Sequence, residues 1–170
     1  MLKALARLAL PLGLAVALAA CSKSGETASV GKVGVDWTGN DIVVEAVADP
    51  DVKGVVCHVA YFSRSLIDRL QQGNWFEDPS YSALDCAASG PITIGKIATD
   101  PGGEEIFKQN RSLIFKSLRV SRIYDKANNS LIYLAHAREI QLGSGKMSLS
   151  VVPLAGLNVT WANGAPNSKF

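Results

Sequence analysis

Two apolar runs joined by a turn constrain the fold of this chain more than any other feature. Residues 41–48 (DIVVEAVA) and 54–62 (GVVCHVAYF) are rich in β-branched and aromatic residues, which favour strands. Between them Pro50 fixes its own φ, and Gly54 permits a sharp change of direction. The pattern predicts a β-hairpin.

Runs of the same kind recur along the chain, with one helical exception. Residues 63–72 place Leu66, Ile67 and Leu70 at helical spacing, and Gly73 ends the segment. Further strands are expected at 83–88, 91–97, from 106 onward, at 112–125 (with both faces buried or a bulge near 116), 131–137 and 147–154. The predicted fold class is mainly β (α+β): a single antiparallel, sandwich-like domain of about seven or eight strands with one short helix.

The N-terminus has the organisation of a secretion signal. Lys3 and Arg7 precede an uncharged run from Leu8 to Ala20, whose thirteen residues suit the apolar core of a signal peptide. A membrane-spanning helix needs about 20 such residues. Residues 1–20 are therefore predicted to be removed.

The run closes on Leu18-Ala19-Ala20-Cys21, which resembles the bacterial lipobox. The resemblance implies cleavage after Ala20 and acylation of Cys21, with residues 21–29 as lipidated cysteine and flexible tether. An ordinary signal before a coincidental cysteine, and an uncleaved anchor, are the alternatives. Because Ser22 rather than Asp follows the cysteine, the expected location is periplasmic, lipid-anchored at the inner leaflet of the outer membrane.

Charge and cysteine content restrict which kinds of partner and which cellular compartment are expected for this protein. The 17 basic and 15 acidic side chains include Lys3 and Arg7 of the signal, so the mature domain is neutral and nucleic acid is not an expected partner. With Cys21 acylated, Cys57 and Cys86 remain, and an even pair in an exported protein indicates a disulfide. A reactive thiol or a metal site is the alternative, although neither cysteine has a CxxC partner or a nearby Cys/His cluster.

Short blocks between residues 41 and 154 carry a family resemblance. They are IVVEA (42–46), DPDVKGVVC (49–57), GPI (90–92), RSLIFKSL (111–118), Arg122 with Tyr124-Asp125, YLA (133–135), and Ser144, Lys146, Ser148 and Ser150 with Val152-Pro153. Together they resemble the CreA family of small bacterial periplasmic proteins, which implies no assigned biochemical activity. The resemblance also supports the disulfide between Cys57 and Cys86. The lipobox, and the poor match from Tyr61 to Tyr81, depart from the family.

On this basis residues 30–157 are predicted to form a CreA-like domain and residues 158–170 a mobile C-terminal tail. No cofactor is predicted.

Motifs for chemistry are sparse. His58 and His136 lie far apart in sequence and lack zinc-site spacing, so each is expected to be an ordinary strand residue rather than part of a shared metal site. Asp49 and Asp51 flank a turn proline, where aspartates bond their own backbone; a calcium site would need more oxygen ligands. GPITIGK at 90–96 lacks the Ser or Thr that completes a phosphate loop, which favours a strand.

Two groups of residues are candidates for contacts. The basic residues Arg111, Lys116, Arg119 and Arg122 could offer one face to an anion or partner, or form surface ion pairs with Glu104, Glu105 or Asp125. Trp75 and Phe76 could mark a contact patch or cap the core. The sequence favours a non-catalytic envelope module that binds a protein partner or small ligand near the membrane. The alternative is an envelope enzyme that uses His58 or His136 with a carboxylate.

Overall fold

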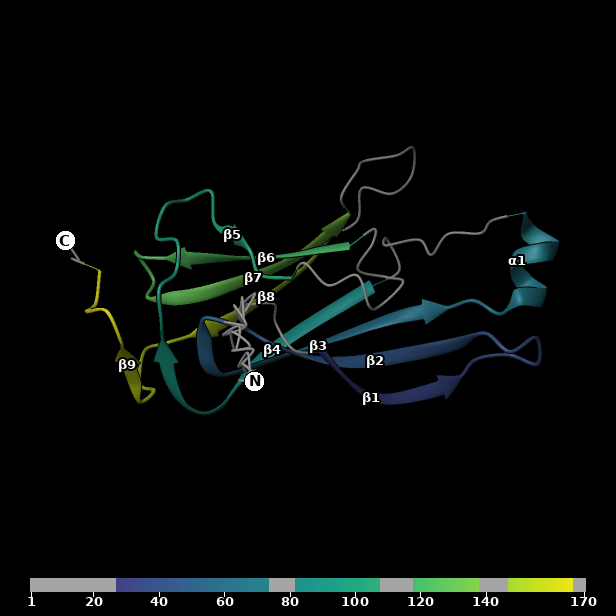
Figure 1. The fold of residues 1–170 in the computed structure, drawn as a ribbon, viewed down its shortest axis with the longest axis horizontal. Helices are drawn as coiled ribbons and strands as arrows, with labels where there is room; N and C mark the ends of the chain where they lie inside the picture. Colours follow the sequence, from purple (N-terminus) through teal and green to yellow (C-terminus); the bar gives the residue numbers. More distant parts are fainter. Residues whose placement is uncertain (1–26, 74–81, 108–117, 138–146, 167–170) are drawn as a thin grey trace, which may run out of the picture.

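Two β-sheets packed face to face make up the described part of the chain, residues 27–73, 82–107, 118–137 and 147–166 of a computed structural model (Figure 1). The first sheet has the strand order β1-β2-β3-β4-β9 and the second the order β5-β6-β7-β8. Their bounds are β1 Thr27–Gly34, β2 Asp41–Ala48, β3 Val52–Ser63, β4 Ser82–Ile94, β9 Val159–Trp161, β5 Glu104–Glu105, β6 Leu118–Asp125, β7 Ser130–Ala137 and β8 Met147–Pro153. The mainly β, single-domain fold class is confirmed.

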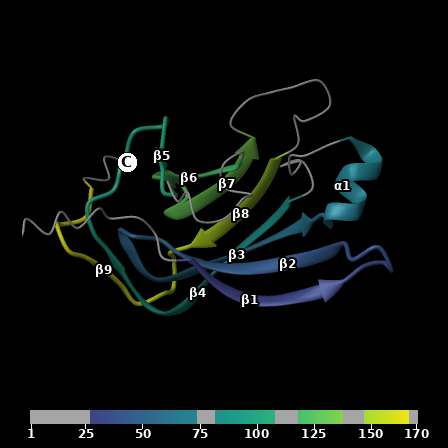
Figure 2. The ribbon, with the colours of Figure 1, turned by 45° about the vertical axis from the view of Figure 1, so that its right-hand side comes forward.

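The predicted hairpin is present as β2 and β3, which pair antiparallel with Val47 opposite Cys57. The predicted helix is α1, Leu66–Gln72, at one end of the molecule (Figure 2). Its N-cap Ser65 accepts a hydrogen bond from the Asp68 amide, and Gly73 ends it in the left-handed conformation with φ 64°. Both elements follow from local sequence signals.

Strand β4 differs from expectation because one strand replaces the two predicted at 83–88 and 91–97. Its register against β3 shifts between Lys53 and Val55, around Gly54. Gly54 has φ 83°, and a Cβ at this position would overlap the carbonyl oxygen of Pro91. Glycine therefore permits both the turn and the close approach of the two strands.

The chain after residue 157 corrects the prediction of a mobile tail at 158–170. Strand β9 pairs with β4 in parallel, with Ile94 opposite Trp161. Trp161 packs against the core and meets Tyr124 edge to face, with ring centroids 5.3 Å apart. Residues 159–161 thus belong to the domain, and residues 167–170 lie outside the described part.

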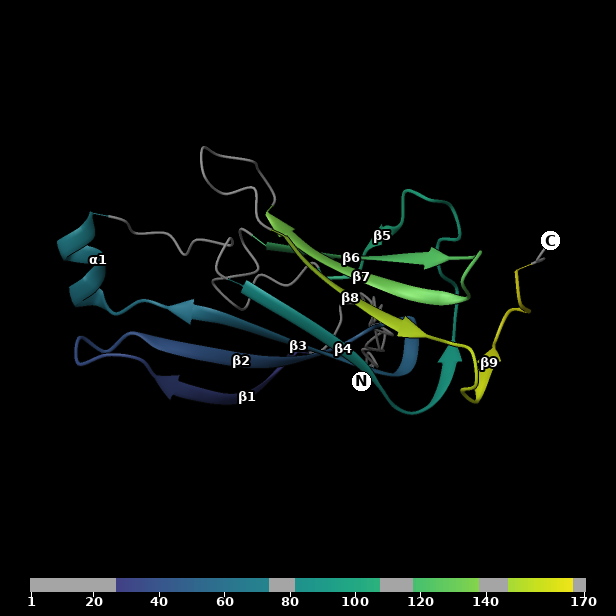
Figure 3. The same ribbon diagram turned by 180° about the vertical axis from the view of Figure 1, so that it is seen from behind.

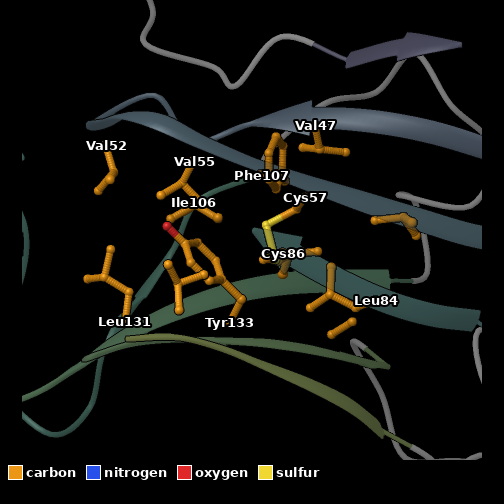
Figure 4. Packing of buried hydrophobic residues seen from close by; sticks show 14 of the residues in the cluster. Val47, Val52, Val55, Cys57, Leu84, Cys86, Ile106, Phe107, Leu131 and Tyr133 are labelled. Carbon is orange, nitrogen blue, oxygen red and sulfur yellow. A yellow bond between two sulfur atoms is a disulfide. The ribbon is translucent and has the colours of Figure 1, made fainter. Parts of the chain in front are cut away.

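The core lies between the sheets and is built mainly from inward-facing residues of β3, β4, β6 and β7 (Figure 4). Val55, Cys57 and Val59 of β3 face Leu131 and Tyr133 of β7 across it. The strand expected to begin at 106 is absent there; β5 ends at Glu105, and Ile106 and Phe107 follow it as buried core residues. The prediction for residues 112–117 lies outside the described part.

The sheets also meet along β4 and β8, which lie close together, as the view from behind shows (Figure 3). Ser148 and Ser150 of β8 accept hydrogen bonds from the backbone amides of Leu84 (2.9 Å) and Cys86 (2.8 Å). These amides lie on the edge of β4 that faces away from β3, where an edge strand would otherwise leave donors unsatisfied. Two serine hydroxyls therefore join the sheets where backbone pairing does not.

Candidate functional site

A buried polar network lies between the two sheets and is centred on Asp49, directly after β2. Asp49 is 5% exposed. Its Oδ1 accepts from the amides of Asp51 (2.9 Å) and Val52 (3.1 Å) and from Nη1 of Arg122, and its Oδ2 accepts from the Tyr133 hydroxyl at 2.9 Å. The backbone bonds confirm the turn role predicted for Asp49. The other two donors come from the second sheet.

Arg122 connects this carboxylate to a second one. It lies on β6, where Leu118, Val120 and Tyr124 also point inward, and only 1% of the residue is exposed. Nη2 of Arg122 donates to Oε1 of Glu104, which also accepts from the Ala98 amide at 3.2 Å. The buried cation is thus balanced by two carboxylates, as a charge in a protein interior requires.

Tyr133 completes the network as a neutral phenol. Burial raises its pKa far above the ordinary value of 10.0, and the adjacent negative charge of Asp49 raises it further. A phenol in this setting donates to Asp49 and does not act as a base. Because Asp49 is only 5% exposed and already accepts four hydrogen bonds, the network suits the joining of the sheets rather than proton transfer.

The predicted basic surface is only partly realised. Arg119 lies on the outer face of β6, with its Nε 3.7 Å from Oε2 of Glu105, as the surface ion-pair interpretation expects. Arg122 is a correction: it pairs with Glu104 as predicted, but its burial withdraws it from any outside anion or partner. Cys21, Trp75, Phe76, Arg111 and Lys116 lie outside the described residues.

The two cysteines form the predicted disulfide. Cys57 and Cys86 are directly opposite on β3 and β4, with Cα atoms 3.9 Å apart and a sequence separation of 29 residues. They are 1% and 5% exposed. The bond is therefore part of the core, and neither sulfur is a free thiol or a metal ligand.

The histidines lie on opposite outer faces of the sandwich. His58 points outward from β3 between the buried Cys57 and Val59, and His136 points outward from β7 between Ala135 and Ala137. A shared metal site is therefore excluded by geometry. In the described ranges, no three His, Cys, Asp or Glu residues gather in a way that could hold a metal ion.

The outer face of the second sheet exposes large apolar side chains. Met147, Leu149 and Val151 of β8 are 68%, 58% and 45% exposed. Their cross-strand partners on β7 are His136, Leu134 and Ile132. Contiguous apolar surface of this kind marks interaction sites in soluble domains. Residues 147–151 alternate between larger apolar and smaller side chains in the sequence, which indicates a strand with two different faces. Which of the two faces is buried becomes clear only from the packing of the two sheets.

Comparison with known proteins identifies the family. The model of the CreA family, described as CreA protein, matches residues 30–157. This chain belongs to the CreA family. Protein CreA of Escherichia coli K12 is 43% identical to it over 116 residues, 66% of this chain and 72% of the relative, and the same values hold for Protein CreA of Escherichia coli O157:H7. No solved structure matches the chain.

Many of the residues that carry the CreA resemblance build the junction of the two sheets. Asp49, Arg122 and Tyr133 form the buried network, while Ser148 and Ser150 hold the edge of β4. These side chains are directed at other parts of the same domain. The family blocks in the described chain therefore contribute to the packing of the two sheets.

Proposed function

We propose that this CreA-family protein is a periplasmic lipoprotein, anchored through acylated Cys21, whose domain is a non-catalytic module that binds an envelope protein. The anchor places it at the inner leaflet of the outer membrane. In this proposal the domain presents the outer face of its second sheet to the partner.

The envelope location is supported by the core disulfide together with the signal. Disulfides persist in oxidising compartments such as the periplasm and are rare in the cytosol. Cys57 and Cys86 are buried on adjacent strands, so their bond is structural. In the described ranges, no helix is long and apolar enough to cross a membrane.

The exposed apolar face of β7 and β8 is the observation that carries the binding proposal. Leu149 is 58% exposed at its centre, flanked by Met147 and Val151. A sheet face suits the flat surface of another protein better than a small ligand, which binds in concave sites. Arg119 and Glu105 provide a charged margin beside it, as polar rims do in protein interfaces.

Photo-crosslinking in living cells tests this proposal. A photoreactive amino acid at Leu149 should yield a discrete adduct with one envelope protein, and Leu134→Glu on the neighbouring strand should abolish that adduct. A matched probe at Val33, which is 60% exposed on the other sheet, should not give it. An adduct that survives Leu134→Glu, or that forms equally from Val33, would contradict the proposal.

A further inference from the structure

The outer face of the first sheet is also apolar, most strongly near the β1–β2 turn. The row nearest the turn aligns Val33, Ile42 and Phe62, and the next aligns Gly31, Val44, Ala60 and Ala83. Val33 and Phe62 are 60% and 41% exposed. Ionisable side chains enter only in the third row, which carries His58 and Asp85.

The same end of the molecule carries further apolar groups. Trp37 in the β1–β2 turn is 93% exposed, and α1 presents Leu66, Ile67 and Leu70 at 71%, 56% and 66%. The turn and the helix are held together, since the Ser65 amide donates to Oδ1 of Asn40 at 2.9 Å (Figure 2). We call Val33, Trp37, Phe62, Leu66, Ile67 and Leu70 the end patch.

We infer that this face of the first sheet, with the end patch, rests on the lipid bilayer to which the chain is anchored. The inference rests on the proposed acylation of Cys21. The structure corrects the prediction of a tether over residues 21–29, because β1 begins at Thr27 and pairs with β2 from there. Only six residue steps therefore separate Cys21 from the first residue of β1. At no more than about 3.6 Å per residue, Thr27 lies within about 22 Å of the membrane surface.

This short tether also limits the orientation of the domain. Strand β1 has eight residues, whose seven steps span about 23 Å at 3.3 Å each, and it runs from Thr27 toward the turn (Figure 1). Because the strand and the turn beyond Gly34 together exceed the reach of the tether, the domain cannot stand on its turn with β1 perpendicular to the bilayer. Strand β1 therefore lies along or oblique to the surface, and Val33 and Trp37 can contact it together.

The chemistry of the end patch fits a membrane interface. Tryptophan prefers the boundary between headgroups and hydrocarbon, because its ring is apolar and its N–H is polar. Helix α1 exposes Leu66, Ile67 and Leu70, the kind of apolar side chain that interfacial helices bury at the boundary between headgroups and acyl chains. Because the two sheets pack face to face, about 10 Å apart, their outer faces point in opposite directions. The outer face of the second sheet is then directed away from the lipid, toward periplasmic partners.

Site-specific labels on the lipidated full chain test the inference. Val33→Cys and Leu149→Cys are matched, because the native residues are 60% and 58% exposed on opposite sheets. Each variant, labelled with an environment-sensitive dye, is reconstituted into phosphatidylethanolamine–phosphatidylglycerol vesicles with or without brominated lipid. The label at 33 should be quenched several-fold more than the label at 149, and its emission should shift to shorter wavelength.

The outcomes separate this inference from the proposed anchor. Intact mass and vesicle flotation report acylation independently of the labels. An acylated, floating protein with equal quenching at 33 and 149, or with none, overturns the docking surface and leaves the anchor standing. Shielding of the label at 33 in detergent that grows with protein concentration indicates a second copy as the occupant and overturns it too. A chain without acyl groups removes the tether and overturns both.

Discussion

Removal of the buried Arg122 side chain tests the network that joins the sheets. Arg122→Met keeps a comparable apolar stem but leaves Asp49 as a buried charge without its cation, a change that costs about 3–5 kcal/mol. Asp49 retains the amides of Asp51 and Val52 and the Tyr133 hydroxyl. We therefore expect the lower end of that range, about 3 kcal/mol, from a total stability on the order of 5–15 kcal/mol.

Urea unfolding of a chain without residues 1–20 and without acyl groups, followed by circular dichroism, measures this loss. With an m-value of about 2 kcal/mol/M, the midpoint should fall by about 1.5 M. Arg119→Met is the matched control on the same strand: its side chain is 42% exposed and its ion pair is 3.7 Å long, so the change should cost less than about 1 kcal/mol.

A second substitution isolates the role of charge. Asp49→Asn added to Arg122→Met removes the stranded carboxylate charge at nearly constant volume and should recover part of the lost stability. Equal costs for Arg122→Met and Arg119→Met would refute the reasoning, because the buried pair would then be worth no more than a surface pair.

Three further substitutions test other parts of the fold. Replacing both Cys57 and Cys86 by alanine opens a link with a sequence separation of 29 residues and should lower the free energy of unfolding by about 3–4 kcal/mol in urea titrations; no loss would contradict a structural disulfide. Because burial raises the pKa of Tyr133 above 10.0, the unfolded chain ionises first. The contribution of Tyr133 to stability should be constant below about pH 10 and be lost as pH rises above it, so Tyr133→Phe should flatten the alkaline fall in unfolding series followed at 295 nm; an unchanged slope would count against the assignment. Gly54→Ala, at φ 83° and against the Pro91 carbonyl, should destabilise by more than about 1 kcal/mol, measured as a lower melting temperature; a neutral effect would contradict the close approach.

Local signals in the sequence predicted the elements that local physics determines. Strand β2 has the predicted bounds, and α1 ends at the predicted glycine, because turn and capping chemistry act within a few residues. The sequence does not predict β9, because three residues carry no periodicity and Ile94, the partner of Trp161, lies far away in the sequence. Tertiary pairing alone makes residues 159–161 a strand.

The buried network around Asp49 also depends on contacts between residues that are distant in the sequence, which local signals do not predict. The sequence indicates a surface position for Arg122, because arginine is rarely buried unless it is paired. Its burial depends on Asp49, 73 positions earlier, and on Glu104 reaching the same point. The sequence did contain one signal, since Arg122 has the same parity as Leu118 and Val120, which face the core. The apolar outer faces likewise required knowledge of how the strands pair.

The most direct test of the proposed function is the intact mass of the protein extracted in detergent from its own membranes, before and after reduction. The account predicts a chain that begins at Cys21, carries acyl groups and gains two hydrogens on reduction of the Cys57–Cys86 bond. A chain that begins elsewhere and carries no lipid would contradict the anchored module proposed above. It would indicate instead a CreA-family domain released without an anchor.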